Sequence, residues 1–165
     1  MTEIPLETVW MVRDTCLCLA TQRAARALAR RFDDASRPLD LTNGQFSMLM
    51  ALNQPKPPTI APLADFLAMD RTTLTAALKP LERRGLITVS VDPDDRRSRL
   101  LRLTAKGRGL LAKALPIWKE HHVLLEQQTQ LADTLRQDLG RLARDVPDAP
   151  PRQTVRTKSS LPCAD

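Results

Sequence analysis

One stretch, from Thr59 to Thr104, restricts the fold more than any other part of the chain. In its first half, apolar residues recur at spacings of three and four over two short segments, which predicts two helices joined by a tight turn. Thr59 and Asp70 are the predicted N-caps of these helices. Residues 86–91 and 98–104 are then two strand-like runs on either side of a polar turn, which predicts a β-hairpin. The stretch therefore predicts a helix-turn-helix followed by a hairpin.

The excess of positive charge lies in the same part of the chain. Residues 71–108 hold ten Lys and Arg against four Asp and Glu, so this segment accounts for the whole formal net charge of +6. The remaining fifteen basic and fifteen acidic residues cancel. Affinity for nucleic acid comes largely from neutralising phosphates, so a basic excess confined to one helix–hairpin unit indicates a polyanion-binding face.

The flanking segments are predicted to be helical. Residues 6–34 place apolar side chains at intervals of three and four without Gly or Pro, which predicts one continuous helix that buries more than one face. Thr42 and Gln45 have the spacing of a capping box at the start of the next helix. Thr104 is the predicted N-cap of a long helix after the hairpin, and a last helix is expected over about 130–144. The leucine stripe of that last helix needs a partner that a small hairpin-bearing unit cannot provide alone.

Two consecutive segments, DRTTLTAALKPLERRGLI and DPDDRRSRLLRLTAKG, resemble the MarR family of winged helix-turn-helix transcriptional regulators. The Asp-x-Arg step of the family's wing is matched by Asp95-Arg96-Arg97, and the strand that ends before a new helix is matched by Leu103-Thr104. The resemblance covers about residues 6–145. It implies a homodimeric repressor that binds a pseudo-palindromic operator in double-stranded DNA and is released by a small ligand or an oxidant.

The predicted fold class is therefore mostly α with a small β-hairpin wing, in which a winged helix-turn-helix is combined with a helical dimerisation region. We expect an N-terminal dimerisation helix over 1–40, the DNA-binding domain over 41–104, C-terminal dimerisation helices over 105–145 and a disordered tail over 146–165. The residues expected at the dimer interface are Leu6, Val9, Leu131, Leu135 and Leu139.

The second helix of the motif would enter the major groove, where side chains near its start reach base edges. By position in the motif, Arg97 would be the wing-tip arginine in the minor groove, with Asp95 bracing either its guanidinium or the turn. An alternative reading of these charges is a solvated face, and Thr73 would alternatively pack under the turn. The expected base contacts are Arg71, Thr72, Thr73 and Thr75, and the expected phosphate contacts are Lys79, Arg96 and Arg99.

The first helix holds the candidate sensor. The segment Leu17-Cys18-Leu19-Ala20 resembles the organic hydroperoxide-sensing branch of the family, in which Cys18 matches the reactive cysteine. That branch places tyrosines where this chain has Gln22 and Phe32, and the alternative is that the cysteines are small buried apolar residues. Three further residues would line a small-molecule cleft, with ordinary core or dimer packing as the alternative. They are Trp10, Cys16 and Trp118.

Several other classes of protein are disfavoured. No run reaches the about 18 apolar residues of a membrane helix, so we expect a cytoplasmic protein without a membrane partner. His121 and His122 are adjacent and lack a further Cys or His cluster, so we expect a solvated helix face, with no metal and no cofactor. The chain lacks a Gly-rich phosphate loop and a nucleophile–base set, so we do not expect an enzyme. The remaining alternative is a winged helix used as a protein–protein interaction module.

Overall fold

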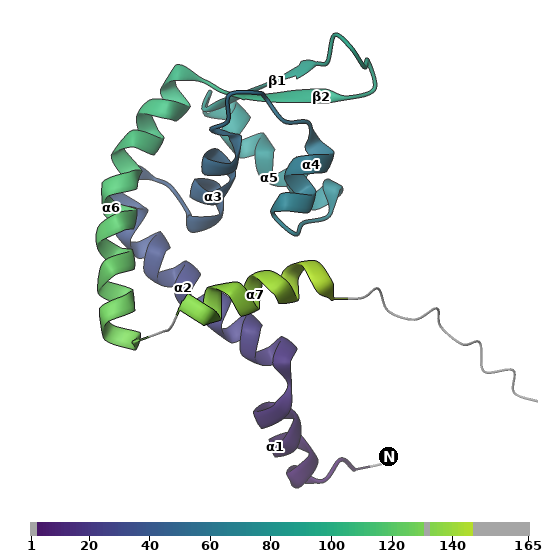
Figure 1. Cartoon of the computed structure of the whole chain (residues 1–165), viewed down its shortest axis with the longest axis vertical. Helices are drawn as coiled ribbons and strands as arrows, with labels where there is room; N and C mark the ends of the chain where they lie inside the picture. Colours follow the sequence, from purple (N-terminus) through teal and green to yellow (C-terminus); the bar gives the residue numbers. More distant parts are fainter. Residues whose placement is uncertain (1–2, 131–132, 147–165) are drawn as a thin grey trace, which may run out of the picture. The chain divides into compact units, whose positions relative to one another are not determined.

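The computed structural model describes residues 3–130 and 133–146, which fall into two units, Met1–Gln130 and Leu131–Asp165. The second unit contains the helix α7, Asp133–Asp145. The elements of the first unit, in chain order, are α1 (Leu6–Thr15), α2 (Leu17–Ser36), the 3-10 helix η1 (Arg37–Leu39), α3 (Asn43–Leu52), α4 (Ile60–Phe66), α5 (Arg71–Arg83), β1 (Ile87–Val91), β2 (Arg99–Leu103) and α6 (Ala105–Thr129) (Figure 1).

The fold class predicted from the sequence, mostly α with a β-hairpin wing, is confirmed. Among the described residues, no helix is both long and apolar enough to cross a membrane. The predicted tail over 146–165, apart from its first residue, and the predicted interface residue Leu131 lie outside the described residues.

Local capping signals set the helix starts. The capping box of α3 is present in both directions, since Thr42 Oγ1 accepts from the Gln45 amide and Gln45 Oε1 accepts from the Thr42 amide, each at 3.2 Å. Thr104 Oγ1 accepts from the Gly107 amide at 3.0 Å and caps α6 as expected. Thr59 stands at the start of α4, but its side chain makes no capping hydrogen bond. Thr59 is thus the N-cap residue, as predicted, without a capping hydrogen bond, and it pairs with Leu100 in an isolated β-bridge.

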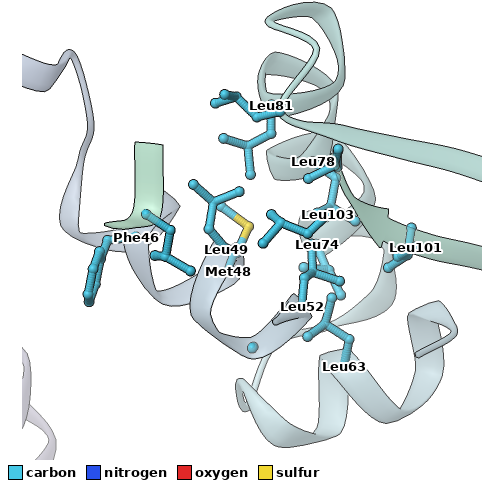
Figure 2. Close-up of a cluster of buried hydrophobic side chains, with 14 of the residues drawn as sticks. Phe46, Met48, Leu49, Leu52, Leu63, Leu74, Leu78, Leu81, Leu101 and Leu103 are labelled. Carbon is cyan, nitrogen blue, oxygen red and sulfur yellow. The ribbon is translucent and has the colours of Figure 1, made fainter. Parts of the chain in front are cut away.

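The core lies where α3, α4 and α5 meet the hairpin and the start of α6 (Figure 2). Leucine dominates it, and each such side chain contributes about 1.5–3 kcal/mol when it leaves water. Side chains from α5 and β2 converge on those of α3, so one face of α5 is fully occupied by packing. The largest fully buried side chains are Leu49, Leu63, Leu74, Leu81, Leu86, Ile87 and Leu101.

The hairpin is anchored at its base. Its strands are antiparallel, with Ile87 opposite Leu103 near the helices and Val91 opposite Arg99 toward the turn. The residues just before α4 pair with β2 beside the hairpin, since the Leu101 amide donates to the Pro58 carbonyl at 3.0 Å. The hairpin extends beyond α4 and α5 in Figure 1.

Two helix boundaries differ from the sequence-based prediction. The continuous helix expected over 6–34 is broken at Cys16, whose backbone is extended (φ −74°, ψ 106°), and Cys16 Sγ accepts from the Leu19 amide at 3.4 Å to cap α2. The last helix begins later than expected, because Gln130 has a left-handed backbone (φ 49°) and ends α6. Neither break falls at a glycine or proline, so the usual local signal was missing.

Two glycines in the first turns of α6 yield a matched prediction. A Cβ on Gly107 would lie 2.1 Å from the Leu86 carbonyl oxygen, whereas a Cβ on Gly109 would meet nothing within 4 Å. We expect Gly107→Ala to destabilise the protein by about 1–3 kcal/mol, because backbone atoms must move. The control, Gly109→Ala, should be neutral or stabilising by up to about 1 kcal/mol through helix propensity. Urea unfolding measures both, and a Gly107→Ala protein as stable as the wild type would contradict the packing described.

Candidate nucleic-acid interface

The orientation of α5 follows from its buried stripe. Leu74, Leu78 and Leu81 pack into the core. The polar residues predicted to meet DNA lie on the remaining surface of the helix and are all exposed, Thr73 included. They are Arg71, Thr72, Thr73, Thr75 and Lys79.

The start of α5 is held by Asp70. Its Oδ1 accepts from the Thr73 amide at 2.8 Å, which confirms the predicted N-cap. Hydrogen bonds from the Thr73 side chain and backbone hold the pKa of Asp70 below its usual range. The Thr75 hydroxyl donates to the Arg71 carbonyl at 2.7 Å, so its remaining capacity toward a ligand is as an acceptor.

The tip of the wing is built around Asp95. Its Oδ1 accepts from the Arg97 amide at 3.0 Å and its Oδ2 accepts from the Ser98 hydroxyl at 2.7 Å. The Ser98 hydroxyl and then the Arg97 amide lower the pKa of Asp95, since both stabilise the carboxylate. Two roles were expected for Asp95, and its hydrogen bonds in the structure are those to the turn. Ser98 was not singled out in the sequence, although its position three residues after an Asp is typical of such a turn.

The basic side chains of this face are exposed and largely uncompensated. Within the described ranges, Arg71, Lys79, Arg96 and Arg97 take part in no ion pair. Arg99 folds back over the turn, where its Nη1 lies 3.2 Å from the Arg96 carbonyl. Exposed cations without acidic partners are available to phosphates, so α5 and the wing tip together can bind a polyanion.

Arg84 has a different role from the other basic residues of the segment. Its Nη1 donates to the Asp40 carbonyl at 2.6 Å and its Nη2 lies 3.5 Å from the Asp40 carboxylate. Lys106 in turn donates to the Arg84 carbonyl at 2.7 Å. These contacts fasten the end of α5 to η1 and α6. They join residues 44 and 22 positions apart, so the sequence pattern contained no signal for them.

The candidate sensor and cleft residues lie on three helices. Cys18 is exposed and Cys16 is half-buried at the start of α2, while Trp10 is exposed on α1. Trp118 is partly buried on α6, where it stacks on Phe46 with ring centroids 6.2 Å apart. Trp118 and Phe46 belong to the winged core, whereas α1 adjoins the N-terminal end of α2 in Figure 1. The structure of one chain therefore does not bring Trp10 and Trp118 together.

The adjacent histidines do not form the solvated face that we expected. His122 stacks on Trp118 with centroids 4.4 Å apart and on Phe32 at 5.4 Å, and His121 meets Phe32 edge-on at 6.5 Å. The reason is that the second half of α2 packs against α6 at this level. Among the residues that the structure describes, no group of three or more Cys, His, Asp and Glu side chains could hold a metal ion.

The predicted dimer residues that can be described are exposed in the single chain. Leu6 and Val9 on α1 are 59% and 51% exposed. On α7, taken by itself, Leu135 and Leu139 are 38% and 42% exposed. Apolar side chains exposed along helices in this way are typical of surfaces that another protein surface covers.

Comparison with known proteins adds independent information. The family model described as MarR family matches residues 41–98. The chain is 32% identical to the organic hydroperoxide resistance transcriptional regulator of Bacillus subtilis over 61% of this chain and 69% of that protein. It is similar to the M. tuberculosis transcriptional regulator MosR in complex with DNA, at 37% identity and a TM-score of 0.72 over 78% of this chain and 94% of that one. It is also similar to the transcriptional repressor CouR bound to p-coumaroyl-CoA, at 28% identity and a TM-score of 0.71 over 87% of this chain and 99% of that one.

The Asp95 turn yields a pH-dependent prediction. Because folding lowers the pKa of Asp95, its stabilising effect is present above the pKa of an unfolded Asp, about 3.9, and is lost as the pH falls through the folded value. We expect faster hydrogen exchange of the Arg97 and Ser98 amides in Asp95→Ala than in the wild type at neutral pH, with the difference vanishing in acid. Asp94→Ala removes the same charge from the same turn and should leave these amides unchanged. Equal exchange in both variants would exclude the bracing role.

Proposed function

The chain belongs to the MarR family and is a DNA-binding transcriptional regulator, and we propose that it acts as a repressor that binds a pseudo-palindromic operator as a homodimer. One observation carries the proposal: the net charge of the protein resides in α5, the wing and the start of α6, and its exposed cations have no acidic partners among the described residues. The alternative of a protein–protein interaction module is not supported, since the similar MosR structure is a DNA complex. The proposal includes no catalytic role.

Each part of the basic face has its own task in the proposed complex. The start of α5 enters the major groove, where four side chains reach base edges, those of Arg71, Thr72, Thr73 and Thr75. Arg97 at the wing tip enters the neighbouring minor groove, whose negative potential attracts a guanidinium. Lys79, Arg96 and Arg99 bind phosphates of the DNA backbone, and these contacts fix the register without reading sequence.

A second copy of the chain accounts for the exposed apolar helices. Along α1, apolar side chains that include Leu6, Val9 and Met11 expose about half or more of their surface in the single chain. A homodimer would cover them and set two α5 helices at one half-site spacing, as a pseudo-palindrome requires. Because the proposed target of the protein is chromosomal DNA, we propose that the protein is cytoplasmic.

The DNA-binding proposal is tested at the wing tip. After genomic footprinting has identified a bound sequence, we expect Arg97→Ala to weaken operator affinity roughly tenfold or more and to reduce the slope of log K against log salt by about 1. Arg23→Ala, which removes the same charge from exposed α2, should leave both quantities near the wild-type values. Sedimentation and circular dichroism confirm that both variants are assembled and folded. Unchanged affinity of Arg97→Ala at physiological salt would overturn the wing assignment.

The regulator is proposed to respond to a small molecule, as the complex of CouR with p-coumaroyl-CoA illustrates for that relative. A peroxide is the second candidate, favoured by the similarity to the B. subtilis organic hydroperoxide regulator and by the exposure of Cys18. Oxidation of a cysteine requires that the oxidant can reach its sulfur, and the exposed position of Cys18 meets this requirement.

The peroxide response is tested by comparing two thiols. We expect cumene hydroperoxide to release the wild-type protein and Cys16→Ser from the operator, and to leave Cys18→Ser bound. Mass spectrometry should find the added oxygen or disulfide on Cys18 in the wild type. Release of Cys18→Ser at the wild-type peroxide concentration would remove Cys18 from the mechanism.

A further inference from the structure

The hydrogen bonds made by side chains of α5 differ between the two ends of the helix. At its start, Asp70 accepts from the Thr73 amide. The Thr75 hydroxyl donates to the Arg71 carbonyl, so these bonds stay within the helix and its cap. At its end, Arg84 bonds to residues outside the helix. Of the hydrogen bonds that the described residues make, those of Arg84 are the only ones that join a side chain of α5 or its caps to another element.

The Arg84 guanidinium reaches the corner where α2, η1 and α3 follow one another. Its Nη1 donates to the Asp40 carbonyl at 2.6 Å and to Gln45 Oε1 at 3.4 Å. Gln45 also closes the capping box of α3. The Asn43 amide, at the start of the same helix, donates to the Asp33 carboxylate of α2 at 2.6 Å. Arg84 therefore joins the end of α5 to a corner that is itself held by hydrogen bonds.

Two parts of Asp40 lie near Arg84, and they are not equivalent. The carboxylate is 95% exposed and lies 3.5 Å from Arg84 Nη2, and an ion pair this open to water contributes little. The carbonyl belongs to a left-handed residue (φ 49°, ψ 48°) that is followed by the buried Leu41, so its position is fixed by the backbone. A bond from a guanidinium to a carbonyl is charge-assisted and roughly twice as strong as a neutral hydrogen bond. The bond to the carbonyl is thus the stronger of the two contacts.

The backbone at the end of α5 is held from the side of α6. Lys106 donates to the Arg84 carbonyl at 2.7 Å. The Thr104 hydroxyl donates to the next carbonyl, that of Gly85, at 2.8 Å. The end of α5 is therefore tied on one side to η1 and α3 and on the other side to the start of α6.

These ties act on the direction of α5 in a way that its leucine stripe does not. Burial of apolar surface is non-directional, so packing permits a tilt of a few degrees more readily than a bond with a preferred angle does. From Arg71 to Arg84 the helix rises about 20 Å, so a tilt of about 3° at its end moves its start by about 1 Å. A shift of this size exceeds the range of distances over which a hydrogen bond to a base edge is made.

We propose that Arg84 is a positioning residue for sequence-specific DNA binding. Its bond to the Asp40 carbonyl holds α5 at the angle at which the start of the helix reads base edges, and Arg84 itself makes no contact with DNA. The inference rests on the proposed entry of α5 into the major groove. Base reading requires a fixed hydrogen-bond geometry, whereas flexible Lys and Arg side chains can follow a phosphate that has shifted. Loss of the Arg84 bond therefore lowers affinity for the operator and spares affinity for unrelated DNA.

The test measures binding to two DNA fragments of equal length, the operator identified by footprinting and a scrambled sequence. The quantity compared is the ratio of the two affinities, because a change in charge alone alters both affinities alike and cancels. Arg84→Met removes the donors and keeps a long unbranched side chain in place, and it should lower the ratio roughly tenfold. Arg84→Lys, which can still donate to the carbonyl, should restore most of the ratio.

Two matched variants separate the contacts. Asp40→Asn removes the carboxylate but keeps the carbonyl and a residue that tolerates a left-handed backbone, so its ratio should stay within about twofold of the wild-type value. Arg83→Ala removes the neighbouring, exposed arginine of α5 and should likewise leave the ratio unchanged. A loss in Asp40→Asn equal to that in Arg84→Met would assign the effect to the ion pair and contradict the proposal.

A third variant, Arg71→Ala, removes a proposed base contact and distinguishes two ways of failing. A lowered ratio in Arg71→Ala with an unchanged ratio in Arg84→Met would show that α5 reads bases without help from Arg84, and would overturn the inference alone. Unchanged ratios in both variants would contradict the proposed place of α5 in the major groove. Urea unfolding accompanies each measurement, and Arg84→Met should be folded. If it does not fold, Arg84 is a stability residue and the positioning role is wrong.

Discussion

The close approach of α6 to the Leu86 carbonyl is the contact on which the arrangement of the winged unit depends. Gly107 permits this approach because it has no Cβ, which would lie 2.1 Å from the Leu86 carbonyl oxygen. The Thr104 amide donates to the same carbonyl at 3.0 Å, and the Thr104 hydroxyl donates to the Gly85 carbonyl at 2.8 Å. The end of α5, the base of the hairpin and the start of α6 therefore meet through backbone atoms. Because backbone contacts tolerate little adjustment, the distance between α5 and the wing is set at this junction.

The parts of the fold that were predictable are those governed by short-range chemistry. The capping box at Thr42 and the N-cap at Asp70 are both decided within four residues, and both are present. The break at Cys16 was missed because neither a glycine nor a proline marks it. The ring contacts of His121 and His122 were missed because they depend on Phe32 of α2, about ninety residues away in the sequence.

The same division applies to the candidate interface. The leucine stripe of α5 predicts which face of the helix is buried, and therefore which residues are exposed on the other faces. All five polar residues predicted to meet DNA are exposed in the structure. The bases and phosphates that these residues contact stay a prediction, because the contacts also depend on the operator sequence. The use of Arg84 as a tie to Asp40 was hidden, because in the sequence it is one more charge in a basic segment.

The residues proposed to contact DNA are different from the residues that hold the winged unit together. The cations of the wing tip and of α5 occupy exposed positions, so changing them alters the field presented to DNA while the buried leucines behind them stay packed. The junction of Arg84, Lys106 and Gly107 has the opposite character, because each of its contacts joins two or three elements.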